Sequence, residues 1–493
     1  MTLPLSDIAA ILPELIVIAA ACLVLGLDPI TPPSKKTSLA WLSLAALGVC
    51  FLLTVSQMEG RVSVFSGMVL VDPYAKYWKL LLYVVSVLTI LMSLAYLKEE
   101  GINLAEYYGF LLLSLSGMMV MVSGADLLTI YLGIELMSLS LYVLAGFKRS
   151  EARSREASAK YFVLGSFSSG IMLYGISLLY GAAGATRLSA LATAVESRGL
   201  DDPLLGMGMV MLVVGFGFKI AAVPFHMWTP DVYEGSPTSV TAFMAVASKA
   251  ASFGAFLRVF TEGLGGLKAD WQMLFLLLCI ATLVLGNVVA IVQTNIKRML
   301  AYSSIAHAGY ALIGIVVTGQ ASADGSVRAL GASGMMLYLA VYAFMTFGAF
   351  AVVGLLRKGG LEGDEIEDFT GLAKRQPLAA FLMLMFMVSL AGIPPTAGFI
   401  GKFYLFRAAV EAGLIWLAVV AVLFAAVSAY FYLRVVMVMY MREPQAESGV
   451  MPRLAGSPAL TVVLACALAG VVLLGLFPNL LVSLAAQAVP TLK

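Results

Sequence analysis

The segment FGFKIAAVPFHMWTPDVYEGSPT, residues 216–238, decides the fold of this chain. It places the ammonium group of Lys219 inside an apolar run, where an ionised side chain is costly and therefore points to a functional site. Pro224 removes a backbone donor and clashes with the preceding turn, so the helix should break beside the charge. Broken backbone within a membrane is tolerated only where it is buried in protein or borders a watery cavity. The charge and the break together predict an ion path.

The composition places the chain among polytopic helical membrane proteins. Of its 493 residues, 61% are hydrophobic and 12% are charged, and the mean hydropathy is +0.97. The charged fraction is about half that of an ordinary globular protein. A net charge of +2 gives no reason to expect nucleic acid as a partner. Residues 1–10 contain no Lys or Arg, so the first span is expected to be retained and not removed as a signal peptide.

The chain offers few residues for binding a cofactor or a metal. Its four cysteines lie far apart in apolar runs without CxxC spacing, which is typical of small core residues and not of a disulfide frame or a metal site. His226 and His307 are its two histidines, and no GxGxxG or GxxxxGK[ST] loop occurs. A nucleotide, flavin or haem site is therefore not expected in this chain, and any electron transfer should take place on other proteins.

Apolar segments long enough to cross a bilayer, about 20 residues each, recur along the whole chain. We predict fourteen spans, at residues 8–27, 39–56, 74–97, 107–123, 125–147, 159–182, 204–225, 237–260, 271–293, 298–318, 329–355, 378–411, 413–440 and 457–484. The twelfth is too long for one straight helix and contains Pro394 and Pro395, so it should be broken as the seventh is.

The Lys and Arg residues of the short loops predict the orientation of the chain. Loops after odd-numbered spans carry sixteen of these residues, including Lys358 and Arg453, whereas the opposite side carries ten, including Lys493. The loops after odd-numbered spans are therefore expected in the cytoplasm, and both termini are expected outside.

Residues 107–260 and 271–440 look like weak copies of one plan. In each, a charge-poor helix, a polar helix and a basic loop come before a proline-broken helix that carries a lysine. Five spans is an odd number, so consecutive copies must be inverted in the membrane, as in many transporters. The predicted organisation is therefore three N-terminal helices over residues 1–106, the two repeats, and a last helix within residues 441–493.

Four ionisable residues lie on four different spans at similar depth. Glu135 stands ten residues into the fifth span, about 15 Å deep, and Lys249 follows Pro237 by twelve residues, or about 18 Å. Lys219 and Lys402 stand beside the two breaks. Burial disfavours the charged form of a lysine, whereas a nearby carboxylate favours it. The set therefore predicts a proton gate formed by Glu135 and Lys219, and a relay of lysines.

Two histidines and two carboxylates have both a functional and a structural interpretation. His226 and His307 could extend the relay, because imidazole titrates near neutral pH. However, His226 lies next to Trp228 and could serve at the membrane interface or as a cap, and His307 could join two helices by a hydrogen bond. Buried ion pairs can also simply pin helices together. Within the first span, Glu14 should face a partner and not lipid, while Asp126 should cap the fifth span.

Five stretches of the sequence resemble the N-subunit family of bacterial NADH:quinone oxidoreductase, respiratory complex I. They are LPELI (12–16), ADLLTIYLGIEL (125–136), KYFVLGSF (160–167), FKIAAVPFHMWTPDVYEG (218–235) and AGIPPTAGFIGK (391–402). The run MWTPDVYEG is highly specific, since the sister subunits L and M and the related Mrp-type antiporters usually carry His-Thr-Trp-Leu-Pro-Asp-Ala there. Lys402 argues against M, which has Glu at that place, and the tail after residue 485 is too short for the long lateral helix of L.

The resemblance implies an all-α membrane protein with fourteen spans, two inverted five-helix repeats, discontinuous helices around the two breaks, and one proton channel. It makes Glu135 and Lys219 the modulating pair, Lys249 the central relay lysine and Lys402 the residue that exchanges a proton with the outside. It places NADH, FMN, iron–sulfur clusters and quinone on other subunits. The expected partners are M-, K-, J- and A-type membrane-arm subunits and lipid, in the bacterial inner membrane.

Two other functions remain open at this point. One is a subunit of an Mrp-type cation/proton antiporter, or of another membrane complex related to complex I. The other is a passive scaffold on which different subunits pump. The sequence motif VYEG at residues 232–235 favours a subunit of the oxidoreductase over a subunit of the antiporter.

Overall fold

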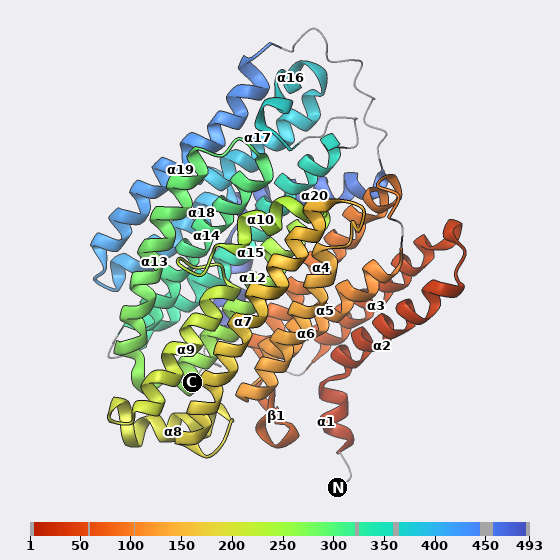
Figure 1. Cartoon of the computed structure of the whole chain (residues 1–493). Coiled ribbons are helices and arrows are strands. Elements are labelled where there is room, and N and C mark those ends of the chain that lie inside the picture. The colour runs from red at the N-terminus through yellow and green to blue at the C-terminus, as the bar shows by residue number, and fades with distance from the viewer. Residues whose placement is uncertain are drawn as a thin grey trace.

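The structure, a computed structural model, describes residues 4–57, 60–102, 104–320, 325–357, 364–443 and 457–489. Lys358, Arg453 and Lys493 of the charge count lie outside these ranges, as do residues 444–456 and 490–493 of the predicted C-terminal region 441–493. Long helices lie side by side across the molecule (Figure 1). The helices α2 (Leu12–Leu27) and α3 (Thr37–Ser56) form one edge, and α13 (Lys268–Ile291) and α19 (Ile415–Met441) form the opposite edge.

Helices account for nearly all of the described residues. Up to the first break the remaining elements are α1 (Leu5–Ala10), β1 (Val62–Val64), β2 (Val69–Val71), α4 (Pro73–Glu99), α5 (Glu106–Ser123), α6 (Leu127–Ala145), α7 (Ala152–Ala183), α8 (Leu188–Arg198) and α9 (Pro203–Lys219). After it come α10 (Trp228–Gly235), α11 (Thr238–Phe243), α12 (Lys249–Arg258), α14 (Ile296–Thr318), α15 (Ser326–Arg357), α16 (Leu372–Arg375), α17 (Pro377–Ala391), α18 (Ala397–Glu411), α20 (Pro458–Leu476) and α21 (Asn479–Ala488). The strands β1 and β2 form an antiparallel hairpin.

The helical membrane architecture predicted from the sequence is confirmed, although the predicted number of spans is not reached. Of the described helices, 12 are long and apolar enough to cross a membrane, or up to 13 if α8 and α9, which meet at an angle of 110°, form one bent span. The predicted span 378–411 is divided into α17 and α18, of 15 residues each. Each half is too short to cross alone, because a span needs about 20 residues.

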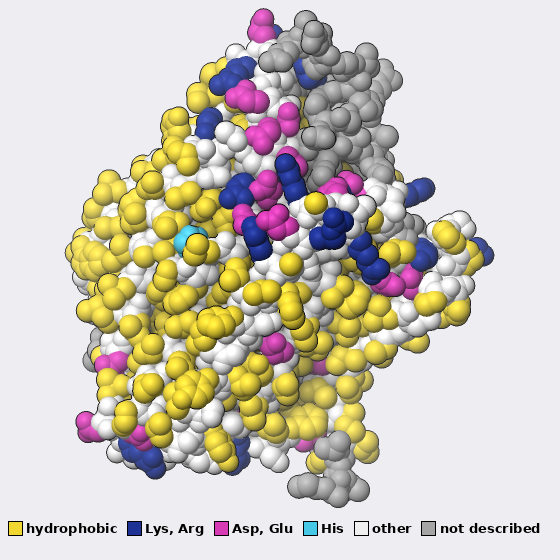
Figure 2. All heavy atoms as spheres, viewed as in Figure 1, with side chains coloured by type: hydrophobic (Ala, Val, Ile, Leu, Met, Phe, Trp, Pro, Cys, Tyr) yellow, Lys and Arg dark blue, Asp and Glu magenta, His cyan; other side chains and the backbone are white. Residues whose placement is uncertain are grey.

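Charged side chains gather toward two opposite ends of the molecule, with a broad hydrophobic surface between them (Figure 2). The elements α8 and β1, which belong to loops predicted on one side of the membrane, lie together at one end, and α16, predicted on the other side, lies at the far end (Figure 1). This arrangement agrees with the predicted alternation of the loops.

The first break begins earlier than the proline that predicted it. The helix α9 ends at Lys219, and Ala221 adopts a left-handed φ of 60°. The indole nitrogen of Trp228 donates a hydrogen bond to the carbonyl of Phe218, 3.1 Å away, and the amide of Val223 donates to the hydroxyl of Thr282 at 2.9 Å. Side chains from other parts of the chain thus satisfy the backbone that the break frees.

The second break lies where the sequence predicted it, between α17 and α18. Gly392 closes α17 with a positive φ of 85°, a conformation that glycine adopts without strain. The amide of Gly398 donates a hydrogen bond to the hydroxyl of Ser389 at 3.2 Å, and this close approach fixes the start of α18 against the end of α17. Ile393, Pro394 and Pro395 are exposed at the tip of the break.

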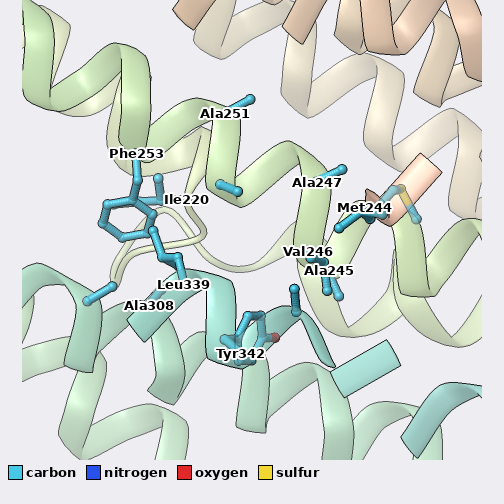
Figure 3. Packing of buried hydrophobic residues seen from close by; sticks show 14 of the residues in the cluster. Ile220, Met244, Ala245, Val246, Ala247, Ala251, Phe253, Ala308, Leu339 and Tyr342 are labelled. Carbon is cyan, nitrogen blue, oxygen red and sulfur yellow. The ribbon is translucent and has the colours of Figure 1, made fainter. Parts of the chain in front are cut away.

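The centre of the molecule consists of helices that are buried on every side. The span Thr238–Gly263, which contains α11 and α12, is buried along almost all of its length, and α14 and α15 are buried along most of theirs. Ile220 of the first break belongs to the same hydrophobic cluster as Phe253 of α12, Ala308 of α14 and Leu339 of α15 (Figure 3). The first break is therefore held against the same helices that carry the central polar residues.

Two local predictions from the N-terminal half are confirmed. Asp126 caps α6, because its carboxylate accepts hydrogen bonds from the amides of Leu128 and Thr129 at 2.9 and 3.2 Å. Glu14 of α2 faces a partner, since its carboxylate lies 2.5 Å from the ammonium group of Lys79 on α4. Each predicted repeat also contains one broken helix with a lysine; the inverted relation of the two repeats stays a prediction.

Candidate functional site

Lys219 and Glu135 lie near each other in one polar cluster, in which the lysine is buried and the carboxylate is half-buried. Lys219 is the last residue of α9, is 4% exposed, and donates a hydrogen bond to the hydroxyl of Ser138 at 2.8 Å. Ser138 follows Glu135 by one turn of α6 and itself donates to the carbonyl of Ile134 at 2.6 Å. The carboxylate of Glu135 accepts a hydrogen bond from Ser169 on α7. Lys219 thus contacts α6 one turn from Glu135, through a serine that has no hydrogen bond to the carboxylate within the described residues.

Lys249 is buried among the central helices and bonded to one serine. Its ammonium group donates hydrogen bonds to the carbonyl and the hydroxyl of Ser304, at 2.7 and 2.6 Å. The hydroxyl of Tyr342 on α15 donates to the same serine hydroxyl at 2.8 Å. Three helices, α12, α14 and α15, therefore meet at the central lysine.

His307 lies one turn further along α14 and connects three helices. Its Nδ1 lies 2.5 Å from the hydroxyl of Tyr338 on α15, and its Nε2 lies 3.1 Å from the hydroxyl of Tyr432 on α19. The hydroxyl of Tyr432 also lies 2.5 Å from that of Ser303, the neighbour of Ser304 in the chain. A line of hydroxyl groups and imidazole therefore begins beside the serine that holds Lys249, so that His307 both joins helices and continues the line.

Lys402 is held by backbone groups. Its ammonium group donates hydrogen bonds to the carbonyls of Leu390 and Ala391, at 3.0 and 2.9 Å, which are the last two carbonyls of α17. The negative end of a helix dipole favours a cation at this place. The ring of Tyr310 lies on another side, with its centroid 4.9 Å from the ammonium nitrogen. Tyr310 also contacts His307 edge-on, at 6.0 Å between ring centroids, so Lys402 reaches the histidine through an aromatic ring.

The structure does not bring every predicted site residue into one network. Within the described residues, the hydrogen bonds of the Lys219 cluster do not extend to Lys249. His226 lies in the first break beside Met227, which is 75% exposed, and takes no part in the hydrogen bonds of Lys219. His226 itself is half-buried, and its role stays a prediction.

Several side chains of the candidate site were not predicted from the sequence. They are Ser138, Ser169, Tyr310, Tyr338, Tyr342 and Tyr432. Tyr338 and Tyr342 stand four residues apart and therefore share one face of α15, which is a signal that sequence analysis could have used. For Tyr432 and Ser169 no such signal exists, because their role depends on which helices become neighbours.

The signature stretch after the first break forms a surface network of ion pairs. Asp231 of α10 lies 2.6 Å from Lys160 of α7 and 2.8 Å from Arg298 of α14, and Glu234 lies 2.8 Å from Arg298. Burial alone would raise the pKa of Asp231, but the hydrogen bonds from Lys160 and Arg298 lower it. The carboxylate therefore stays ionised and ties α10 to the two helices beside it.

No group that could hold a metal ion occurs within the described residues. Three or more His, Cys, Asp or Glu side chains do not converge anywhere in that part of the chain. The groups around the predicted site residues instead are lysines, hydroxyls, an imidazole and the carboxylate of Glu135, which are groups that pass protons.

Known proteins resemble the chain over almost its whole length. Residues 124–428 match the family described as NADH:quinone oxidoreductase/Mrp antiporter, TM. The NADH-quinone oxidoreductase subunit N 2 of Rhizobium meliloti (strain 1021) is 47% identical over 97% of either chain. Subunit N of Trichlorobacter lovleyi is 45% identical over 98% of this chain and 97% of its own.

Solved structures also resemble the chain over almost its whole length. A chain of respiratory complex I from Thermus thermophilus is similar with a TM-score of 0.78 at 32% identity, over 96% of this chain and 99% of that one. A chain of the Mrp complex from Dietzia sp. DQ12-45-1b reaches a TM-score of 0.83 over 98% of this chain and 97% of that one, but at 21% identity. The second likeness shows the fold alone.

Two broken helices with buried lysines, and polar side chains on the helices between them, define an antiporter-like membrane subunit. The relatives narrow this class further. The chain belongs to the NADH:quinone oxidoreductase/Mrp antiporter family and, within it, to the subunit N branch of NADH-quinone oxidoreductase.

Proposed function

We propose that this chain is the proton-translocating membrane subunit N of an NADH:quinone oxidoreductase, and that it couples electron transfer on other subunits to proton pumping. The observation that carries the proposal is a pair of polar groups that meet on α14: Lys249 donates to Ser304, and the neighbouring residue Ser303 begins a line through Tyr432 to His307. Each member can both donate and accept a hydrogen bond in one of its protonation states, which proton transfer along a line requires. The subunit N relatives, at up to 47% identity, support the same function.

Each ionisable residue has a separate role in this scheme. Glu135 and Lys219 form the modulating pair, because a change of charge on the carboxylate alters the electrostatic potential at the lysine. Lys249 is the central proton carrier, since it lies on the line of hydroxyl groups. Lys402 exchanges the proton with the outside, and His307 connects it with the centre. In this scheme His226 is not a proton carrier.

The surroundings of the subunit follow from the same proposal. NADH, FMN, iron–sulfur clusters and quinone bind on other subunits, and the neighbours in the membrane arm are of the M, K, J and A types. The chain crosses the bacterial inner membrane, with both termini on the periplasmic side, as the excess of Lys and Arg in the loops after odd-numbered spans indicates.

The test is proton pumping by the whole purified complex in proteoliposomes. The substitution Lys249→Ala should lower NADH-driven pumping by at least about tenfold, because general acid–base catalysis contributes about 10²-fold or more to the rate of a proton-transfer step. Lys268→Ala is the matched control, since Lys268 is exposed at the start of α13 and should leave pumping unchanged. Wild-type pumping and electron transfer in the Lys249→Ala complex would contradict the relay and favour a passive scaffold.

The sodium dependence separates the oxidoreductase from the antiporter. The fold alone is shared with the Mrp complex, so sodium/proton exchange is the competing activity. We expect NADH-driven pumping to continue in sodium-free buffer. Pumping that stops without sodium would favour the antiporter.

A further inference from the structure

The helix α12 carries a cation at each end, on opposite faces. Lys249 is its first residue and Arg258 its last, and they are 2% and 0% exposed. Nine residues are two and a half turns of an α-helix, so the two side chains point in opposite directions. Lys249 contacts α14, whereas Arg258 points toward α4. Arg258 is therefore not a continuation of the proton line.

Arg258 is held by a buried, two-bonded ion pair. Its two terminal nitrogens donate hydrogen bonds to the two carboxylate oxygens of Asp72, each at 2.9 Å, and both side chains are 0% exposed. Asp72 is itself fixed as the cap of α4, because it accepts a hydrogen bond from the amide of Ala75 at 2.8 Å. Such parallel bonds define direction as well as distance. The end of α12 is thus fixed to the start of α4.

The same face of α12 touches α4 one turn earlier. The hydroxyl of Tyr74 donates a hydrogen bond to the carbonyl of Gly254 at 2.7 Å, and a Cβ at Gly254 would lie 3.1 Å from the ring of Trp78. Gly254 and Arg258 are four residues apart and share one face of the helix. Together these contacts leave α12 little freedom to turn or slide against α4.

Both ends of α12 join π-helical turns. Residues Met244–Ser248 form one directly before Lys249, and Val259–Gly263 form the other directly after Arg258. A π-turn contains one residue more than an α-turn and often occurs at functional sites. A return of the first turn to α geometry would rotate α12 by about 100° and shift it by about 1.5 Å. Such a change would take Lys249 away from Ser304.

We propose that the Asp72–Arg258 pair is the positioning device of the central lysine: it holds α12 in the register in which Lys249 reaches Ser304. This role goes beyond the function proposed above and depends on Lys249 being a proton carrier. Asp72 and Arg258 do not take part in proton transfer themselves. They act through the helix, from the face opposite the lysine.

The test uses Asp72→Asn and Arg258→Lys in the complete complex. The asparagine keeps the shape and the cap of α4 but loses the charge, and the lysine keeps the charge but loses the second parallel bond. We expect Asp72→Asn to lower the NADH-driven pumping rate per assembled complex by about threefold to tenfold, and Arg258→Lys to lower it less. A pair that only stabilises the fold would reduce the amount of complex and leave the rate per complex unchanged.

The matched control is Glu14→Gln, which makes the same change in the buried pair of Glu14 and Lys79. That pair joins α4 to α2 and does not touch α12. The pumping rate per assembled complex of Glu14→Gln should therefore equal that of the wild type. Equal losses of pumping rate in Asp72→Asn and Glu14→Gln would overturn the inference, and so would failure of both Asp72→Asn and Arg258→Lys to assemble. Normal pumping in Asp72→Asn combined with lost pumping in Lys249→Ala would overturn the positioning role alone. Normal pumping in Lys249→Ala would instead overturn the proposed function.

Discussion

Each of the two broken helices combines a proline-containing break with a buried lysine, but the two lysines have different hydrogen-bond partners. At the first break, Lys219 donates to the side chain of Ser138, next to Glu135. At the second break, Lys402 donates to the carbonyls of Leu390 and Ala391, with no carboxylate among its hydrogen-bond partners. One lysine is thus held beside a group that can change its charge, and the other beside fixed dipoles.

The position of each lysine relative to its break explains the difference. Helical side chains lean toward the N-terminus of their own helix. Lys402, the sixth residue of α18, therefore leans back over the break and reaches the carbonyl end of α17. Lys219, the last residue of α9, leans back along its own helix, away from the break, and reaches α6. The first break can consequently respond to a distant charge, whereas the second provides a constant environment.

The largest difference between the breaks should appear when each lysine is replaced by an uncharged side chain of similar length. Lys402→Met leaves two buried carbonyls without their donor, at about 1–3 kcal/mol for each. Lys219→Met leaves only the hydroxyl of Ser138, which keeps its bond to Ile134. We expect both variants to lose at least about tenfold in pumping, but only Lys402→Met to lower the free energy of unfolding, by about 2–6 kcal/mol.

Thermal denaturation of the purified complex and the amount assembled measure this difference, with each variant serving as the control of the other. Equal losses of stability in the two variants would mean that the hydrogen bonds from Lys402 to the backbone carbonyls do not stabilise the second break more than the Ser138 bond stabilises the first.

A smaller effect should follow from removing the charge of the carboxylate at the first break. Glu135→Gln keeps the shape and a hydrogen-bond acceptor for Ser169, but it takes away the charge that acts on Lys219. We expect pumping to fall by roughly fivefold to tenfold with stability unchanged, since couplings of this kind amount to about 1 kcal/mol. Glu156→Gln is the control, because Glu156 is an exposed carboxylate on α7 that pairs with Lys160. An equal loss in both variants would contradict a modulating role for Glu135.

The sequence alone predicts the breaks well and the partners of the lysines poorly. Pro224, Pro394 and Pro395 mark both breaks because proline acts locally on its own helix. The end of α9 at Lys219 was not predicted, since it depends on a left-handed Ala221 and on Trp228 reaching back to Phe218. The buried charges could be recognised because their energetic cost follows from the residue and its apolar neighbours.

Partners from distant helices could not be predicted in the same way. Ser138 contacts Lys219 across 81 residues of sequence, and Tyr432 contacts His307 across 125. Such contacts depend on the register in which helices pack, and that register cannot be recognised from local patterns in a single sequence. The roles of the hydroxyl groups therefore became visible only in the structure.

The smallest effect should come from the surface network of ion pairs that holds the first break, a kind of network that the described residues do not form at the second break. Asp231 is one-third exposed, so Asp231→Asn should lower the free energy of unfolding by less than about 1 kcal/mol and leave pumping unchanged. Because Lys160 and Arg298 hold the pKa of Asp231 below its usual value, the stabilisation is fully present above that usual value. It is lost only as the pH falls through the lowered pKa.

The difference in thermal stability between the wild type and Asp231→Asn should therefore stay constant from about pH 6 to about pH 8, when both are measured in the same complex. Asp201→Asn, at an exposed aspartate between α8 and α9, is the control for the substitution itself and should show no difference. If the difference in thermal stability between the wild type and Asp231→Asn decreased as the pH fell from 8 to 6, Asp231 would titrate in the neutral range. The first break would then be held by a pH-sensitive contact, and its difference from the second break would extend from the membrane interior to the surface.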